Sequence, residues 1–169
     1  MLFRSLGLAE DPTEESFHKS LAGAPRLRAE GKLIELAVVD STAGDFLGAA
    51  TLHAFNRAHR RAEVGIWLAR GAQGQGFATA ALELVLGWAF EGLELMRLET
   101  STAPDNRAAV RLASRLGFQG EGLLRKRYFE RGKWLDVVLF GLLLEDWVAR
   151  DRSLPQHPPD PPPPDDDEG

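Results

Sequence analysis

The sequence contains no cysteine, which excludes disulfide bonds and metal sites built on thiolates. Its four histidines show no spacing typical of a ligand set, so we predict no metal. No apolar run approaches the roughly 18 residues that a membrane-spanning helix needs, and no signal-peptide pattern opens the chain. We therefore expect a cytoplasmic protein with no membrane partner.

Charge is distributed unevenly along the chain. The 169 residues carry a formal net charge of −5, but five of the 25 acidic residues follow Pro155, where there is no lysine or arginine. Without that end the charges balance, which argues against a nucleic-acid partner. Because the end is rich in proline and aspartate, it cannot bury apolar surface. We expect one domain over residues 1–153 and a disordered tail over residues 154–169.

Residues 62–92 predict a strand, a glycine-rich turn and a helix. The segment Ala62–Leu68 is apolar and contains β-branched and aromatic side chains, as in a buried strand. Gly71, Gly74 and Gly76 follow, and from Phe77 apolar residues recur at steps of three and four. The first N–H groups of a helix have no partner within it, so such a turn can bind an anionic group.

Two known anion-binding motifs compete for this stretch. A Walker loop is excluded because it ends in lysine, and the chain has no lysine between positions 32 and 126. A dinucleotide fingerprint fits Gly74 and Gly76, with Glu99 as the acid on the ribose, but Thr79 replaces the third glycine. The preceding strand-like segments are also joined by turns too short for parallel crossovers. A doubly wound dinucleotide fold is therefore the weaker interpretation.

Three motifs in order carry a family resemblance, at residues 73–78 (QGQGFA), 106–118 (NRAAVRLASRLGF) and 128–137 (YFERGKWLDV). The first resembles the acetyl-CoA signature of the GNAT superfamily of N-acetyltransferases, and the second resembles the family's second signature. The third resembles the closing hairpin of the branch that acetylates the N-terminal alanine or serine of ribosomal proteins. The resemblance covers roughly residues 33–144.

The resemblance implies an α+β (mixed α/β) fold. Its central sheet would be mixed and mostly antiparallel, flanked by helices, with two parallel central strands that splay apart. The sequence predicts strands at 33–40, 46–53, 62–68, 95–100, 123–129 and 134–144, and helices at 77–92 and from 103 to 117. We also expect a first strand at 2–6, a helix at 12–21 and a closing segment at 145–150. This opening is shorter than the family's usual one.

By resemblance, the chain binds acetyl-CoA as co-substrate, without a metal. Turn amides would hold the diphosphate, and strand amides would face the thioester carbonyl, where they could stabilise an oxyanion. The predicted cofactor-binding residues are Trp67, Leu68, Gln73, Gly74, Gln75, Gly76, Phe77, Ala78, Thr79 and Asn106.

The catalytic residues are less clearly marked. Glu63 is the first candidate for the base that deprotonates the amine, acting through water, and His53 and Asp136 are weaker candidates. The tyrosine that usually protonates the departing thiolate is replaced by Ala113. Tyr128 is the only tyrosine and thus the remaining candidate acid.

These features predict an N-acetyltransferase that moves an acetyl group to a primary amine by direct attack in a ternary complex. The expected acceptor is a protein N-terminal α-amine. The alternatives are a small-molecule or antibiotic amine, or a non-catalytic acyl-CoA-binding module. The expected partners are coenzyme A and the amine, in a monomer or a homodimer.

Overall fold

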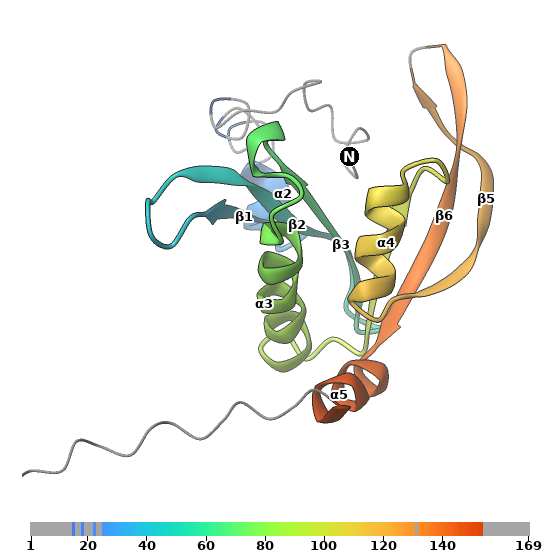
Figure 1. The fold of residues 1–169 in the computed structure, drawn as a ribbon. Helices are drawn as coiled ribbons and strands as arrows, with labels where there is room; N and C mark the ends of the chain where they lie inside the picture. The colour runs from blue at the N-terminus through green and yellow to red at the C-terminus, as the bar shows by residue number, and fades with distance from the viewer. Residues whose placement is uncertain (1–14, 16–17, 19–21, 23–24, 131, 154–169) are drawn as a thin grey trace, which may run out of the picture.

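The computed structural model describes residues 15, 18, 22, 25–130 and 132–153 (Figure 1). The strand expected at 2–6 and the tail at 154–169 lie outside the described residues, as does nearly all of the helix expected at 12–21. The strands are β1 (Leu33–Val39), β2 (Phe46–Asn56), β3 (Arg61–Leu68), β4 (Arg97–Thr102), β5 (Gln119–Glu130) and β6 (Lys133–Leu143). The helices are α2 (Pro25–Ala29), the 3₁₀ turn η2 (Arg70–Ala72), α3 (Phe77–Glu91), α4 (Arg107–Arg115) and α5 (Leu144–Ser153).

The described strands form one six-stranded sheet in the order β1-β2-β3-β4-β6-β5. Every neighbouring pair is antiparallel except β3 and β4, which are parallel. That exception follows from α3, because a helical crossover returns the chain in the direction in which it left. The predicted α+β fold with a mostly antiparallel mixed sheet is therefore confirmed, and a doubly wound dinucleotide fold is wrong.

The core lies between the sheet and the helices α3 and α4, which cover the same face (Figure 1). Alternate residues of β2 and β3 enter it, among them Leu52 and Val64, and meet Leu86 from α3 and Leu116 from α4. Since strand side chains alternate between faces, Glu63 and Trp67 point to the opposite face. The sheet therefore has one face packed on α3 and α4 and another that carries several charged residues.

Several local features differ from the sequence prediction, among them the start of α4 at Arg107 instead of 103 and a two-residue shift of β4. Strand β2 extends to Asn56 past a register irregularity, where Ala54 has a φ of 51°, so the expected loop 54–61 shrinks to four residues. Strand β5 begins at Gln119, four residues early, because it pairs with β6 from there. Helix α2 was not predicted, since its five residues bury no side chain and leave no apolar pattern.

Candidate active site

Strands β3 and β4 pair only at their beginnings. Their ladder joins Arg61 to Arg97, Ala62 to Leu98 and Glu63 to Glu99, whereas β3 continues to residue 68 and β4 to residue 102. No pairing between the two strands is formed beyond Glu63 in the described sheet. The predicted splay of the two parallel strands is thus present.

A small apolar cavity lies where the two strands separate. It is lined by residues 64–66 of β3, Leu82 of α3, Thr100 of β4, and the α4 residues Ala109, Leu112 and Ala113. Ala113 is buried at the position where the resemblance places a tyrosine. The small side chains of Ala109 and Ala113 leave room at this end of α4.

The register of β2 and β3 determines which amides face the gap. The N–H of Ala69 donates to the carbonyl of Leu47 at 2.8 Å, which places the odd-numbered backbone groups of β3 toward β2. The amides of Ile66 and Leu68 consequently point toward the separating strand β4, and that of Trp67 points toward β2. The carbonyl of Leu68 accepts a hydrogen bond from Gln73 Nε2 at 2.9 Å, as expected for a group directed away from β2.

The glycine-rich turn presents a set of backbone N–H groups with no acceptor. The last bond before the turn runs from the N–H of Gln73 to Arg70, and the first after it runs from the N–H of Thr79 to Gly76. Between them, the amides of residues 74–78 donate no hydrogen bond within the described chain. Gly74 and Gly76 have φ values of 77° and 90°, and space for a Cβ is open at both. The left-handed backbone, rather than crowding, favours glycine here.

Two glutamines stabilise the turn from within. Gln73 Nε2 donates to Leu68 as above, and Gln75 Nε2 donates to the carbonyl of Gly71 at 2.6 Å. Their side chains are therefore engaged with the backbone, which sequence reasoning did not anticipate. Phe77, Ala78 and Thr79 form the first turn of α3 and have half-buried side chains.

Asn106 occupies the N-cap position of α4. Its side-chain oxygen accepts a hydrogen bond from the N–H of Ala109 at 3.2 Å, the contact typical of an N-cap asparagine. Since Ala109 also lines the cavity, this cap holds the end of α4 that meets the gap.

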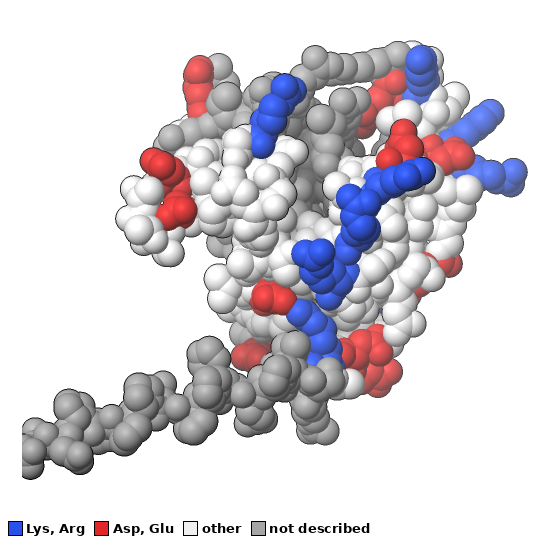
Figure 2. Space-filling view, in the orientation of Figure 1, with Lys and Arg blue, Asp and Glu red and all other residues white. Residues whose placement is uncertain are grey.

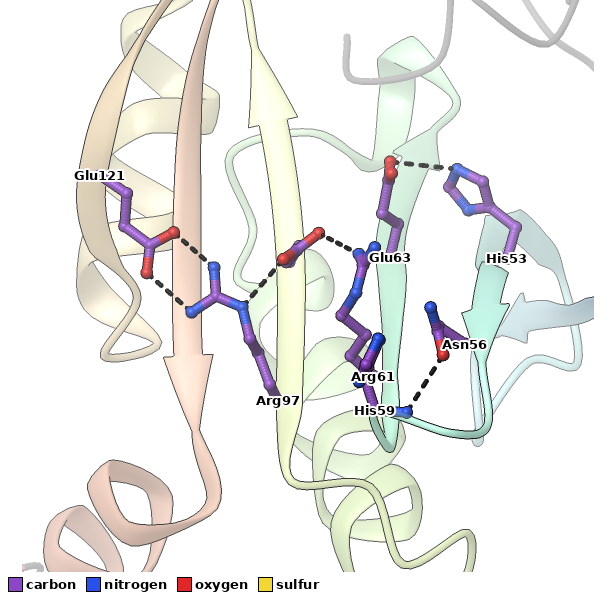
Figure 3. Close-up of polar contacts among 8 residues, drawn as sticks. His53, Asn56, His59, Arg61, Glu63, Arg97 and Glu121 are labelled. Atoms are coloured by element: carbon purple, nitrogen blue, oxygen red, sulfur yellow. Dashed lines mark hydrogen bonds and ion pairs between the residues drawn. The ribbon is translucent and has the colours of Figure 1, made fainter.

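Two of the three candidate bases, Glu63 and His53, lie together on the sheet face opposite α3. They are direct neighbours across β2 and β3, and their Nε2 and Oε2 atoms are 3.6 Å apart (Figure 3). Burial lowers the pKa of His53 below its ordinary value, and the negative charge of Glu63 opposes that effect in part. The imidazole is therefore neutral at neutral pH.

Beside this pair, four charged side chains from β3, β4 and β5 form a chain of ion pairs that passes over β6 (Figure 3). Glu99 accepts from Arg61 Nη1 at 2.9 Å and from Arg97 Nε at 2.8 Å, and Arg97 Nη1 also donates to Glu121 at 2.8 Å. The hydrogen bond to Glu121 raises the pKa of Arg97 and lowers that of Glu121. Glu99 is thus held by two arginines and does not serve as the ribose acid of a dinucleotide site.

Tyr128 lies apart from Glu63. It is half-buried on β5, opposite Leu135, and the guanidinium of Arg127 lies 5.8 Å from its ring centroid. Two strands, β4 and β6, separate it from β3 in the sheet. Asp136 accepts a hydrogen bond from the N–H of Lys126 at 2.7 Å, where the hairpin register is irregular and Lys126 has a φ of 51°. This contact gives Asp136 a structural role in the hairpin.

Positive charge gathers on the face that carries α4. Figure 2 shows lysine and arginine side chains over α4 and the β5–β6 hairpin, while the surface of α3 is largely uncharged. Arg107, Arg111 and Arg115 are exposed and recur every four residues along α4. This field favours the approach of an anionic ligand.

Within the described residues, no group of three or more histidine and acidic side chains is arranged to hold a metal ion. No helix among them is both long enough and apolar enough to cross a membrane.

Comparisons with known proteins identify the family. The family model of the acetyltransferase (GNAT) domain matches residues 4–119 of this chain. A putative ribosomal N-acetyltransferase of Bacillus subtilis is 35% identical over 62% of this chain and 57% of its own length. Across the first relatives matched, the chain spans 56% to 69% of their length.

Solved structures of N-acetyltransferases have the same fold as this chain. Mutant forms of the spermidine/spermine N-acetyltransferase from Vibrio cholerae match with a TM-score of 0.71 and 27% identity, over 82% of each chain. The ribosomal-protein-S5-alanine acetyltransferase from Vibrio fischeri matches with a TM-score of 0.69 and 25% identity, over 80% of this chain and 74% of that one.

A mixed sheet that opens between two parallel strands, next to a helix that begins in a glycine-rich turn, defines the acyltransferase class to which these proteins belong. The chain belongs to the GNAT acetyltransferase family and is an N-acetyltransferase. The predicted resemblance, including its ribosomal-protein branch among the relatives, is confirmed.

Proposed function

We propose that this chain transfers the acetyl group of acetyl-CoA to a protein N-terminal α-amine. The observation that carries the proposal is the separation of β3 from β4 beyond Glu63, with the amides of Ile66 and Leu68 directed into the gap. A strand edge with free backbone groups can pair with the peptide-like amides of the pantetheine arm. The same amides are suited to stabilise an oxyanion on the thioester carbonyl.

The diphosphate binds, in this proposal, to the amides of residues 74–78. Those five N–H groups have no acceptor of their own within the described chain and stand at the positive end of α3. The side chains of Gln73 and Gln75 support the turn, and Thr79 closes its first helical bond. Asn106 contributes by holding the start of α4 at the cavity. Trp67 lies between Ile66 and Leu68 on β3, and its own amide points toward β2, so it supports the site only as part of the strand.

The amine attacks the thioester directly, so no enzyme nucleophile is required. Glu63 removes the proton of the amine through a water molecule, and Tyr128 protonates the departing thiolate. Deprotonation at pH 7 costs about 1 kcal/mol for an α-amine of pKa about 7.7 and about 4.6 kcal/mol for a lysine of pKa about 10.4. A site whose base acts through water therefore suits an α-amine better than a lysine side chain.

A polyamine is the second candidate acceptor, because one of the matched structures is a spermidine/spermine N-acetyltransferase. The state of the carboxylates on the sheet face opposite α3, among the described residues, weighs against it. Glu35 pairs with Arg28, and Glu99 pairs with two arginines, which leaves few acidic groups for a second or third ammonium.

We further propose that residues 1–153 form a single cytoplasmic domain with a Pro/Asp-rich tail, active as a monomer or a homodimer.

Release of coenzyme A thiol against a panel of acceptors tests the proposal. Peptides that begin with free alanine or serine should release thiol, and the same peptides with a blocked N-terminus should not. Faster release with spermidine than with any peptide would transfer the assignment to polyamines. Tight coenzyme binding without release on any amine would favour a non-catalytic acyl-CoA-binding module.

A further inference from the structure

His53 and Glu63 form a pair whose geometry is set by the sheet. The two residues are directly opposite on the antiparallel strands β2 and β3, so their side chains leave the same face side by side. Both side chains are partly buried, with 27% and 30% of their surface exposed. Figure 3 shows the imidazole and the carboxylate pointing toward each other.

The orientation of the His53 ring indicates which of its nitrogens faces Glu63. Nδ1 of His53 is buried, whereas Nε2 is the nitrogen directed at the Glu63 carboxylate. A neutral imidazole carries one N–H, and a neighbouring carboxylate can only accept. The favourable neutral tautomer therefore has its hydrogen on Nε2, pointing at Glu63.

Two other charged groups near His53 in the described part of the chain, Glu35 and Arg61, each form an ion pair with another residue. On the side of β1 and α2, Glu35 is bound by Arg28, and on the side of β4, Arg61 is bound by Glu99. The strand residue directly opposite His53 on β1 is Leu33, which has no charge. Among the described groups, Glu63 is thus the charged side chain that interacts with the imidazole.

We propose that His53 is a positioning residue that holds the Glu63 carboxylate as a base while the imidazole is neutral, and that protonation of the imidazole silences Glu63 by forming an ion pair. The inference rests on the proposed function, in which Glu63 removes the proton of the amine. Glu63 lies three positions before Ile66, about 10 Å along a strand, so in this proposal the carboxylate reaches the amine through water.

The proton balance of the step is simple. The amine nitrogen forms a C–N bond with the acetyl carbonyl carbon, its proton passes through water to Glu63, and the C–S bond breaks. The thiolate takes a proton from Tyr128, which solvent reprotonates, or from solvent directly, and Glu63 returns its proton to solvent. When His53 is protonated, the carboxylate is engaged by a cation and is a weaker proton acceptor.

Two substitutions at His53 separate positioning from simple packing. His53→Gln retains an N–H donor but cannot titrate, so kcat at pH 8 should stay within a few-fold of wild type, and the loss of kcat/KM on acidification should move to lower pH. His53→Leu fills similar space without a donor, so kcat should fall roughly 10- to 100-fold at pH 8, by analogy with the loss of an outer-shell orienting group. Acetyl-CoA affinity should be unchanged in both.

His59→Gln is the matched control, because His59 is exposed in the turn after β2 and should leave the pH profile of kcat/KM unchanged. Equal kcat values for His53→Leu and wild type, or an unchanged acid limb in His53→Gln, would overturn the inference.

Nitrogen-15 NMR of the histidine ring tests the pair without turnover. The resting protein should show the Nε2–H tautomer of His53, with a titration midpoint below the ordinary value of 6.5. Glu63→Gln should lower that midpoint further. An Nδ1–H tautomer, or a midpoint insensitive to Glu63→Gln, would overturn the inference even in an active enzyme. An inactive wild type with the expected tautomer and midpoints would instead contradict the proposed function, because the pair would then exist without catalysis.

Discussion

Glu63 on β3 and Glu99 on β4 are the last residues that pair the two parallel strands of the sheet. Their environments differ, since Glu99 is held by Arg61 and Arg97 while Glu63 meets the neutral ring of His53. Glu99 lies within an ion-pair network where the ladder ends, and Glu63 stands as a charged group beside the opening. The end of the ladder therefore separates a structural carboxylate from a candidate catalytic one.

The first prediction concerns the left-handed turn. Gly76→Ala should lower the free energy of unfolding by about 1–2 kcal/mol, because an alanine at φ 90° is strained although its Cβ meets no atom. It should also weaken acetyl-CoA binding, since the turn amides would shift. Denaturant unfolding and calorimetric titration measure the two effects. Gly71→Ala is the control, with equally open space, no positive φ and an expected change within about 0.5 kcal/mol. Equal effects of the two substitutions would contradict the prediction.

The second prediction concerns the ion-pair network. Glu99→Gln should destabilise the protein by about 1–3 kcal/mol, because only 15% of the Glu99 side chain is exposed. The two arginines would lose their shared negative charge, and one of them would face the amide NH2, which cannot accept its hydrogen bond. Glu121→Gln should cost less than about 1 kcal/mol, since that side chain is 36% exposed. Urea unfolding of both variants measures the difference. The prediction is refuted if Glu121→Gln is the more destabilising change.

The third prediction is a pH dependence of stability. The pKa of His53 is lower in the folded protein than in the unfolded chain, so below pH 6.5 the unfolded chain binds more protons. The contribution of neutral His53 to the unfolding free energy is fully present above pH 6.5 and is lost as pH falls through the folded pKa. Wild type should therefore lose more unfolding free energy than His53→Gln between pH 7.5 and the folded pKa. If the unfolding free energies of wild type and His53→Gln fall in parallel with pH, the pKa of His53 is not lowered in the folded protein.

The fourth prediction concerns the candidate acid. Tyr128→Phe should lower turnover with little change in acetyl-CoA affinity, since the ring is retained and only the hydroxyl is removed. Steady-state kinetics and calorimetric titration of the coenzyme separate the two quantities. Unaltered turnover would remove Tyr128 from the mechanism and leave it as a packing residue of the β5–β6 hairpin.

Local patterns predicted most elements well. Helix α3 begins at Phe77 and ends at Glu91 as its periodicity and the following glycine indicated, and Asn106 caps α4. The hairpins fall where turn residues separate apolar runs. The early start of β5 and the extension of β2 were missed, because strand ends depend on the partner strand.

The site was only partly visible in the sequence. The turn could be predicted because left-handed backbone favours glycine, which is visible in the sequence. No sequence pattern indicates that the side chains of Gln73 and Gln75 donate to the backbone of the turn. The direction of the Ile66 amide required the register of β2 and β3. The pairing of His53 with Glu63 could have been suspected from strand alternation, but only a known register places them opposite each other.

The sequence by itself determined the order of the elements, the anion-binding turn and the family, because these depend on residues close together in the chain. The tertiary structure decided where β3 and β4 separate, which amides face the gap and which carboxylate is left beside a neutral histidine. Those features depend on pairings between residues that lie from 10 positions apart, as His53 and Glu63, to 38 positions apart, as Arg61 and Glu99. A shift of one residue in a strand reverses every side chain and every amide.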